Sequence, residues 1–186
     1  MASRIAVGID VGTYQVRVVI ARESSDRSTA FPKIIGTGYA ESKGLRHGYI
    51  VSPDDVNRSI ELAVAQAERA VKTRLRRAFV SIGGMSLDEV FSRGEAVVTR
   101  GDSIISERDV EAAINAAEAA ISPSQLLNRT IIDRIPLRFF VDGNKVLGNH
   151  PAGMNGMKIS VEMLFLTALT QHLQSLRDTV EDAGVE

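Results

Sequence analysis

Two stretches near the N-terminus alternate apolar with polar or small residues, and this period of two predicts a pair of β-strands. The stretches span residues 5–11 and 16–20, and in each of them every second residue is Ile or Val. Gly12-Thr13 lies between them, where the chain must reverse, and glycine can turn without a Cβ clash. The sequence therefore predicts a tight hairpin at the start of the chain.

Further along, segments with apolar residues at helical spacing lie between segments with the strand pattern. Ser52-Pro53 marks the start of one helix, since serine caps helices and proline fits the first turn. The predicted order is a strand at 31–40, a helix at 53–73, strands at 78–82 and 89–99, a helix at 106–121, strands at 128–141 and 158–167, and a helix at 171–182. Because strands and helices alternate and the first hairpin is antiparallel, we expect a mixed chain whose sheets are not all parallel.

Two glycine pairs interrupt or follow predicted strands. Gly36-x-Gly38 lies inside a strand pattern, which predicts either a bulge or a close approach of two backbones. Gly83-Gly84 follows a strand, where it could form a phosphate-binding turn. A turn that joins two domains is the simpler interpretation of this second pair.

The composition narrows the chemistry that the chain can perform. It has 186 residues, a formal net charge of −1 and no cysteine. A disulfide scaffold, a thiolate nucleophile and a zinc finger are therefore excluded, and general nucleic-acid binding is disfavoured. The three histidines, His47, His150 and His172, do not have metal-ligand spacing, and no nucleophile–base pair is evident, so we do not expect a self-contained enzyme. No apolar stretch approaches the roughly 20 residues of a membrane span, and we expect a cytoplasmic protein.

The tip of the predicted hairpin gathers groups that suit a nucleotide phosphate. Backbone N–H groups in a tight turn form a concave anion site. The Thr13 hydroxyl lies beside them, and Arg17 adds a positive charge. The Asp10 carboxylate could hold Mg²⁺ through water. The alternative is an ordinary hairpin that contains aspartate and glycine, because Asp-x-Gly is a short and common pattern.

Four segments in order carry a resemblance to a known family. Residues 10–17, DVGTYQVR, resemble the first phosphate loop of the actin-like and sugar-kinase ATPases. Residues 36–50, 79–84 and 135–156 are similar to successive parts of the N-terminal half of the FtsA family, the bacterial actin-like cell-division proteins. This resemblance covers nearly the whole chain. Pilus-assembly proteins of the PilM type share the fold and remain an alternative, as does a truncated sugar-kinase-like enzyme.

The resemblance implies a mixed fold, α+β with α/β parts. Its larger part would be half of an actin-like, ribonuclease-H-like ATPase subdomain, called 1A, formed by residues 1–77 and 157–186. An SHS2-type subdomain, called 1C, would be inserted between these two pieces and comprise residues 78–156.

The same resemblance implies roles for residues of the first hairpin. Asp10 would hold Mg²⁺ through water. The β- and γ-phosphates of ATP would accept hydrogen bonds from the backbone N–H groups of Gly12, Thr13 and Tyr14 and from the Thr13 hydroxyl. Arg17 stands where many relatives have lysine, so the charge is kept while the phosphate contact stays open. No residue is assigned a catalytic role.

The partners that the resemblance implies are proteins. Subdomain 1C would contact other division proteins and mediate self-association, and the complete protein would help to assemble the divisome and tether FtsZ to the membrane. The family's second phosphate loop, FtsZ site and membrane-binding helix would lie beyond Glu186. This part alone would therefore bind ATP and Mg²⁺ weakly or not at all, and would contact neither membrane nor nucleic acid. We expect the complete protein at the inner face of the cytoplasmic membrane at the division site.

Overall fold

The computed structural model describes residues 5–24 and 31–185, which form two compact units. Unit 1 consists of residues 1–86 and 171–186, and unit 2 consists of residues 87–170. Unit 2 is thus inserted in the chain between two pieces of unit 1. Each unit has a sheet and a hydrophobic core of its own.

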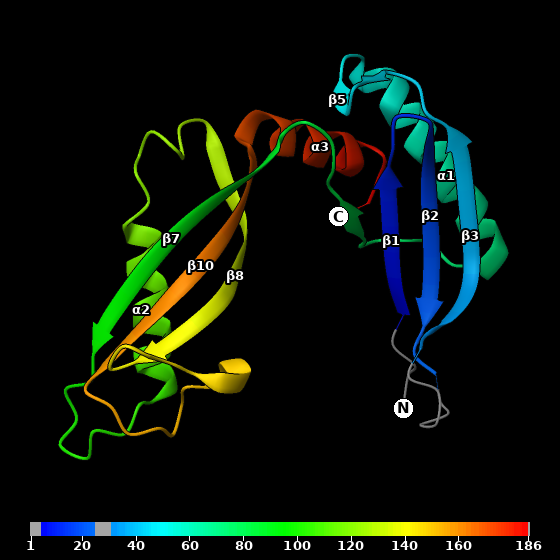
Figure 1. Cartoon of the computed structure of the whole chain (residues 1–186). Helices are drawn as coiled ribbons and strands as arrows, with labels where there is room; N and C mark the ends of the chain where they lie inside the picture. The colour runs from blue at the N-terminus through cyan, green and yellow to red at the C-terminus, as the bar shows by residue number, and fades with distance from the viewer. Residues whose placement is uncertain (1–4, 25–30, 186) are drawn as a thin grey trace. The chain divides into compact units, whose positions relative to one another are not determined.

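Unit 1 is built on a four-stranded sheet with the order β3-β2-β1-β6 (Figure 1). Its strands and helices are β1 (Ile5–Val11), β2 (Gln15–Arg22), β3 (Lys33–Glu41), β4 (Leu45–Arg46), β5 (Tyr49–Ile50), α1 (Pro53–Val71), β6 (Phe79–Ser81) and α3 (Thr170–Asp182). The first three strands are antiparallel neighbours, whereas β6 runs parallel to β1. The predicted N-terminal hairpin is therefore confirmed, within a sheet of mixed direction.

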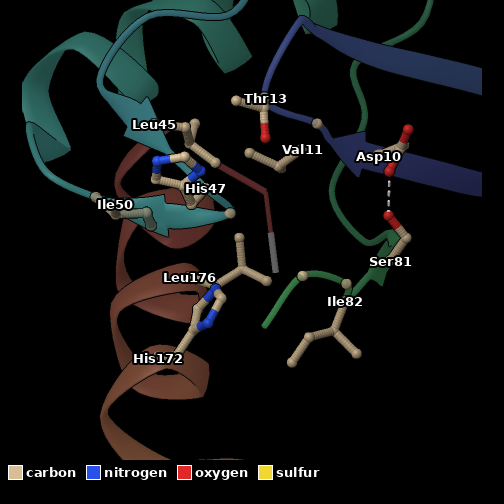
Figure 2. A pocket seen from close by; sticks show the side chains of 14 residues that line it. Asp10, Val11, Thr13, Leu45, His47, Ile50, Ser81, Ile82, His172 and Leu176 are labelled. Carbon is tan, nitrogen blue, oxygen red and sulfur yellow. Dashed lines mark hydrogen bonds between the residues drawn. The ribbon is translucent and has the colours of Figure 1, made fainter. Parts of the chain in front are cut away.

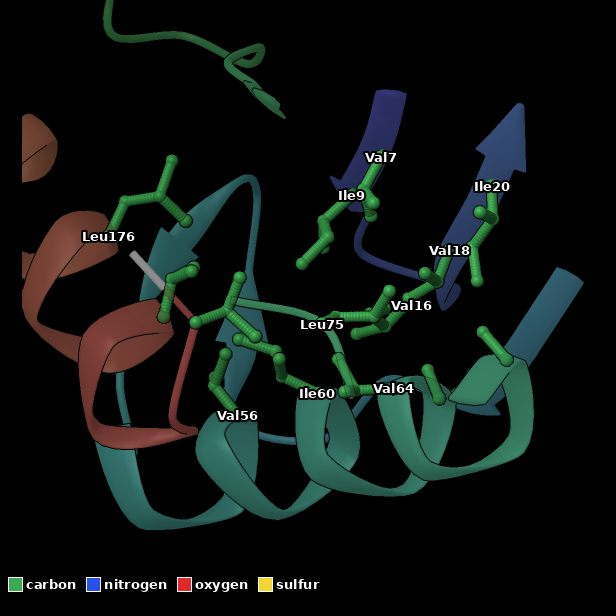
Figure 3. Close-up of a cluster of buried hydrophobic side chains, with 14 residues drawn as sticks. Val7, Ile9, Val16, Val18, Ile20, Val56, Ile60, Val64, Leu75 and Leu176 are labelled. Carbon is green, nitrogen blue, oxygen red and sulfur yellow. The ribbon is translucent and has the colours of Figure 1, made fainter. Parts of the chain in front are cut away.

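The core of unit 1 lies on one face of this sheet, as Figure 3 shows. The alternating residues of the hairpin all point to that face, and α1 and α3 supply the other side. The buried members are Val7, Ile9, Val16, Val18, Ile20, Val56, Ile60, Ala63, Val64, Ala67, Leu75, Leu176, Val180 and Val185. The apolar residues that repeat every two positions in the strands and about every 3.6 positions in the helices thus form one buried layer.

Glycine lets α1 pack directly against the edge strand β3. A Cβ on Gly38 would overlap the backbone carbonyl oxygen of Ala63, and one on Gly36 would stand 2.8 Å from Val71 Cγ1. The ladder between β2 and β3 also shifts register after Ile20, beside Gly36. The predicted close backbone approach is therefore confirmed at Gly36-x-Gly38, and the ladder is irregular beside it.

Unit 2 is an antiparallel sheet with the order β7-β10-β8-β9, covered on one face by a helix. Its elements are β7 (Leu87–Val97), α2 (Glu107–Ala119), β8 (Arg129–Val141), β9 (Asn144–Lys145), the 3₁₀ turn η1 (Leu147–Asn149) and β10 (Lys158–Leu169). The Ser106 backbone N–H donates to Asp109 Oδ2 at 2.8 Å, which caps the start of α2. A Cβ on Gly94 would overlap the backbone of Ala113 and Ala117, so the helix lies close against β7.

The two units divide the chain differently from the sequence-based boundaries at residues 78 and 156. Strand β6, at 79–81, pairs with β1 and so belongs to unit 1. Strand β10 pairs with both β7 and β8 and is central to unit 2. Strand pairing therefore sets the boundaries at 86/87 and 170/171. The Gly83-Gly84 turn lies close to the first of them, whereas residue 156 precedes the whole of β10.

Candidate functional site

The loop at the tip of the first hairpin has only three residues, Gly12, Thr13 and Tyr14, between β1 and β2. The backbone carbonyl oxygen of Gln15 lies 3.1 Å from where a Cβ on Gly12 would stand, so a larger residue would crowd the turn. Outside the strand ladders, no described backbone hydrogen bond has Gly12, Thr13 or Tyr14 as its donor. The loop therefore has backbone N–H groups to offer to an anion.

Asp10 lies near the end of β1, on the face of the sheet opposite the core. It is exposed, and its direct cross-strand neighbour on β2 is Arg17. Ser81 Oγ donates to Asp10 Oδ1 at 2.5 Å from the neighbouring strand β6 (Figure 2). When the Gln15 side-chain amide is turned so that its oxygen faces the guanidinium, it accepts from Arg17 Nη2 at 2.7 Å.

A cavity of about 310 Å³ opens beside this loop within unit 1. Its walls come from the hairpin tip, the β4–β5 hairpin, the turn after β6 and the first turns of α3, as Figure 2 shows. The lining residues are Asp10, Val11, Gly12, Thr13, Leu45, His47, Gly48, Ile50, Ser81, Ile82, Gly83, Gly84, His172 and Leu176. The cavity thus has polar groups at the hairpin tip, and its other walls combine apolar residues with Ser81, His47 and His172.

The β4–β5 hairpin meets the turn after β6 through two glycines. His47 and Gly48 form its turn with φ angles of 52° and 84°, a pair of positive values that fits a type I′ hairpin. A Cβ on Gly48 would stand 3.2 Å from the Gly84 Cα. This contact brings the backbone of the Gly83-Gly84 turn to the wall of the cavity, in unit 1 rather than at a domain joint.

His172 is the one histidine of the cavity that is buried. Its ring lies 5.3 Å from that of Tyr49, measured between centroids, and its Nδ1 has no hydrogen-bond partner. Burial lowers the pKa of this imidazole below its ordinary value, because desolvation disfavours the charged form. His172 therefore contributes a largely apolar ring face to the cavity wall, with its Nδ1 buried and without a hydrogen-bond partner.

The structure brings together some of the residues that the sequence singled out. Asp10, Gly12 and Thr13 line the cavity, whereas Tyr14, which is 83% exposed, and Arg17 do not. His47 and His172 were not recognised as site residues, because they are far apart in sequence and lack ligand spacing. Only the fold, which places β4–β5 and α3 beside the hairpin tip, brings them into one cavity.

The groups at the hairpin tip fit a magnesium-bound phosphate. Among residues 5–24 and 31–185, no group of three or more His, Cys, Asp or Glu side chains could hold a metal ion by itself. Mg²⁺ usually keeps several waters and is held through one or two carboxylates together with phosphate oxygens. Asp10 supplies one such carboxylate and the loop supplies N–H donors, so phosphate and metal would be held jointly.

The described helices include none that is both long and apolar enough to cross a membrane.

Comparison with known proteins gives one match to unit 2 alone and others to nearly the whole chain. Residues 90–167, which fall within unit 2, match the domain family described as "SHS2 domain inserted in FTSA". Over 184 residues, 99% of this chain, the sequence is 33% identical to the cell division protein FtsA of Bacillus subtilis. Over 179 residues, 96% of this chain, it is 32% identical to FtsA of Streptococcus pneumoniae. The chain spans 40% and 37% of the lengths of these two relatives.

Among solved structures, the chain is similar to one described as the PilM–PilN type IV pilus biogenesis complex. The TM-score is 0.57 at 16% sequence identity, and the match covers 97% of this chain and 45% of that chain. An identity this low concerns the fold alone. The match supports the mixed α/β architecture of an actin-like ATPase subdomain with an SHS2 insertion.

Proposed function

This chain corresponds along nearly its whole length to the N-terminal part of the FtsA cell division proteins, and from that premise we propose two roles for it. Unit 1 supplies one side of a Mg·ATP site. Unit 2, which carries the SHS2 match, supplies a surface for contact with other division proteins and for self-association. In the complete protein both would serve an actin-like scaffold of the division machinery.

The observation that carries the nucleotide proposal is the cavity beside the first hairpin. It combines the Asp10 carboxylate, the Thr13 hydroxyl and the backbone of a tight turn on one rigid strand pair. In this proposal Asp10 holds Mg²⁺ through water, while Gly12, Thr13 and Tyr14 donate backbone hydrogen bonds to the phosphates. Oriented N–H groups suit phosphate because they bring donors to the anion without a counter-charge.

Arg17 is proposed to act at longer range than the loop. Its side chain does not line the cavity, and the Gln15 amide can hold it over the sheet. A positive charge at that distance would favour an anion's approach, and a direct contact with phosphate would need a change of rotamer.

The match covers 40% of the Bacillus subtilis relative, so the remaining roles are proposals about the whole protein. We propose that the complete protein binds ATP between this unit and later parts of the chain. It would then tether FtsZ to the inner face of the cytoplasmic membrane at the division site. No catalytic residue is proposed within unit 1 or unit 2.

A pilus-assembly role of the PilM type is the second candidate. The structural match to the PilM–PilN complex supports it through similarity of fold alone. Sequence favours the first candidate, because identity to the FtsA proteins of two species is twice as high, at 33% and 32% against 16%.

The nucleotide proposal is tested by titrating the ¹⁵N-labelled 186-residue chain with Mg·ATP and following amide shifts by NMR, which detects weak binding. We expect shifts at Gly12, Thr13 and Tyr14 with a Kd on the order of millimolar, about 4 kcal/mol. Asp10→Asn should abolish the dependence on Mg²⁺. Asp54→Asn, at an exposed carboxylate of α1 away from the cavity, is the matched control and should titrate like the parent chain.

Two results would contradict the proposal. Shifts that map away from the hairpin tip would place the nucleotide elsewhere. Micromolar affinity would show that unit 1 forms a complete site rather than one side of it.

A further inference from the structure

Strand β7 forms a long free edge of the unit 2 sheet. It pairs with β10 on one side over eleven positions without a register shift, and it is the last strand of the sheet order. The Glu89 backbone N–H donates to its own neighbour, Asp88 Oδ1, at 2.9 Å, while the Val98 N–H points inward and donates to Met157 O. Since the direction alternates along a strand, the N–H and C=O groups of the odd-numbered residues face outward.

The side chains of these odd-numbered residues lie on the face of the sheet away from α2. On the α2 face, Val90 and Gly94 are buried. On the open face Glu89 and Arg93 are exposed, and Phe91 between them is 62% exposed. A long, regular edge with an exposed aromatic side chain is a template for another strand.

The β3 edge of the unit 1 sheet is partly covered by α1, whereas the β7 edge has no such cover among the described contacts. On β3 the Tyr39 backbone N–H donates to Gln66 Oε1 at 2.8 Å, so a side chain of α1 takes the place of a neighbouring strand. Among the described hydrogen bonds, the only side-chain acceptor along the β7 edge is the carboxylate of Asp88, which serves Glu89.

When two copies of β7 run antiparallel, the charged side chains of one copy can lie opposite side chains of the opposite charge on the other. With a two-fold axis at Phe91, Glu89 of each copy lies opposite Arg93 of the other, and the two Phe91 rings meet at the axis. Opposite charges and aromatic rings stabilise directly opposed positions, whereas like charges destabilise them. A shift of the axis to position 92 would oppose Glu89 to Glu95 twice, and a shift to 93 would oppose Arg93 to itself.

Existing contacts already hold the Arg93 side chain on the open face. Arg93 Nη2 donates to Ser160 Oγ at 3.1 Å, and the guanidinium lies 5.3 Å from the centre of the Phe140 ring. Glu95 Oε1 lies 3.8 Å from Arg93 Nη2, a long ion pair that leaves other guanidinium donors available. No described ion pair includes the Glu89 carboxylate.

We propose that the β7 edge is a homotypic interface, in which a second copy of this chain adds its β7 antiparallel with the two-fold axis at Phe91. The inference rests on the proposed function, because it specifies the strand and register of self-association through unit 2. A single strand edge buries little area, so the contact is weak on its own and gains strength when copies are held side by side.

A cysteine at the axis tests the register directly, because the chain has no cysteine of its own. In this register the two Cα atoms at position 91 are about 5.5 Å apart, within the range of a disulfide. The Phe91→Cys variant should therefore form a covalent dimer under mild oxidation. Leu87→Cys, also exposed on β7, is the matched control, since its two copies would be roughly 26 Å apart and should not cross-link.

Charge reversal tests the pairing independently. In the Phe91→Cys background, Glu89→Arg and Arg93→Glu should each lower the cross-linking rate roughly tenfold, because each places like charges opposite one another twice. The double variant Glu89→Arg with Arg93→Glu exchanges the charges and should restore the rate. Thermal unfolding of each variant verifies that unit 2 is intact.

The outcomes separate this inference from the proposed function. Self-association seen by sedimentation, without cross-linking at position 91 or with equal cross-linking at position 87, would overturn the β7 interface and leave self-association standing. A chain that stays monomeric at millimolar concentration would overturn both. Failure of the double variant to recover would overturn the register.

Discussion

Ser81 and Asp10 occupy directly paired positions on the parallel strands β6 and β1, and the serine hydroxyl donates to the carboxylate at 2.5 Å. The bond joins the first hairpin to the short strand that leads into the Gly83-Gly84 turn. Two walls of the cavity are thereby fixed relative to each other. Ser81 orients the carboxylate through Oδ1, and no described hydrogen bond uses Oδ2.

Replacing Ser81 by alanine should loosen this connection. One hydrogen bond to a charged group is lost at an exposed site, so the free energy of unfolding of unit 1 should fall by about 1 kcal/mol. Chemical denaturation monitors the change, and Ser124→Ala, at an exposed serine of unit 2, should leave unit 1 unaffected. An equal effect of the two substitutions would mean that the Ser81–Asp10 bond does not stabilise the sheet.

Gly38→Ala should be strongly destabilising. The added Cβ would overlap the Ala63 carbonyl oxygen in the backbone of α1, which cannot move without displacing the helix. We expect a loss of about 3 kcal/mol. Gly8→Ala is the matched control on β1, because a Cβ there meets nothing within 4 Å, and its effect should stay below about 1 kcal/mol. Similar losses in both variants would rule out helix contact as the cause.

The buried His172 should make unit 1 sensitive to acid. Its folded-state pKa lies below the ordinary value of 6.5, so the unfolded chain binds a proton more readily than the folded chain. The stability that the neutral ring contributes is present above that value and is lost as the pH falls through the folded-state pKa. The melting temperature of the parent chain should therefore drop on going from about pH 7.5 to about pH 5.5.

His172→Phe keeps a ring against Tyr49 and removes the titration. Its melting temperature should fall less over the same pH interval than that of the parent chain. His150→Gln, at an exposed position in unit 2, controls for the loss of a histidine as such. An unchanged acid response in His172→Phe would assign the response to other groups.

Deletion of unit 2 tests the boundaries. Removing residues 87–170 and joining the ends with a short Gly-Ser linker should leave a folded unit 1, because all of its strands are kept. Removing 78–156 should not, because it deletes β6 and leaves β10 without its partners β7 and β8. Amide NMR spectra distinguish a folded from an unfolded product. Two equally folded products would show that β6 is dispensable.

Long periodic segments were predictable from the sequence, and short ones were not. The first hairpin and α1 have several residues that repeat one period, and α1 ends at Val71 against a predicted 73 because Lys72 takes a left-handed conformation with φ of 55°. The β4–β5 hairpin has two residues per strand, too few to show a period. The contact-based boundaries at 86/87 and 170/171 differ from the expected 78 and 156, because β6 pairs with β1 and β10 pairs with β7 and β8, and a resemblance along the chain carries no information about strand partners.

The candidate site was predictable only where its residues are adjacent in sequence. Asp10, Gly12 and Thr13 lie on one hairpin, so a local motif could identify them as neighbours of one cavity. His47 and His172 reach the same cavity from β4–β5 and α3, and no local pattern connects them. The exposure of Tyr14 likewise depends on how the loop projects from the sheet, which the alternation of apolar residues does not determine.

The late position of α3 in the chain has a consequence for the order of synthesis. The core of unit 1 joins Ile9 on β1 to Leu176 on α3, so a ribosome must complete all of unit 2 before this core can close. Unit 2 has all its strands by then and can finish folding first, although it is encoded second. The nascent chain therefore carries an unfinished N-terminal sheet with uncovered apolar side chains, the state in which chains need chaperones most.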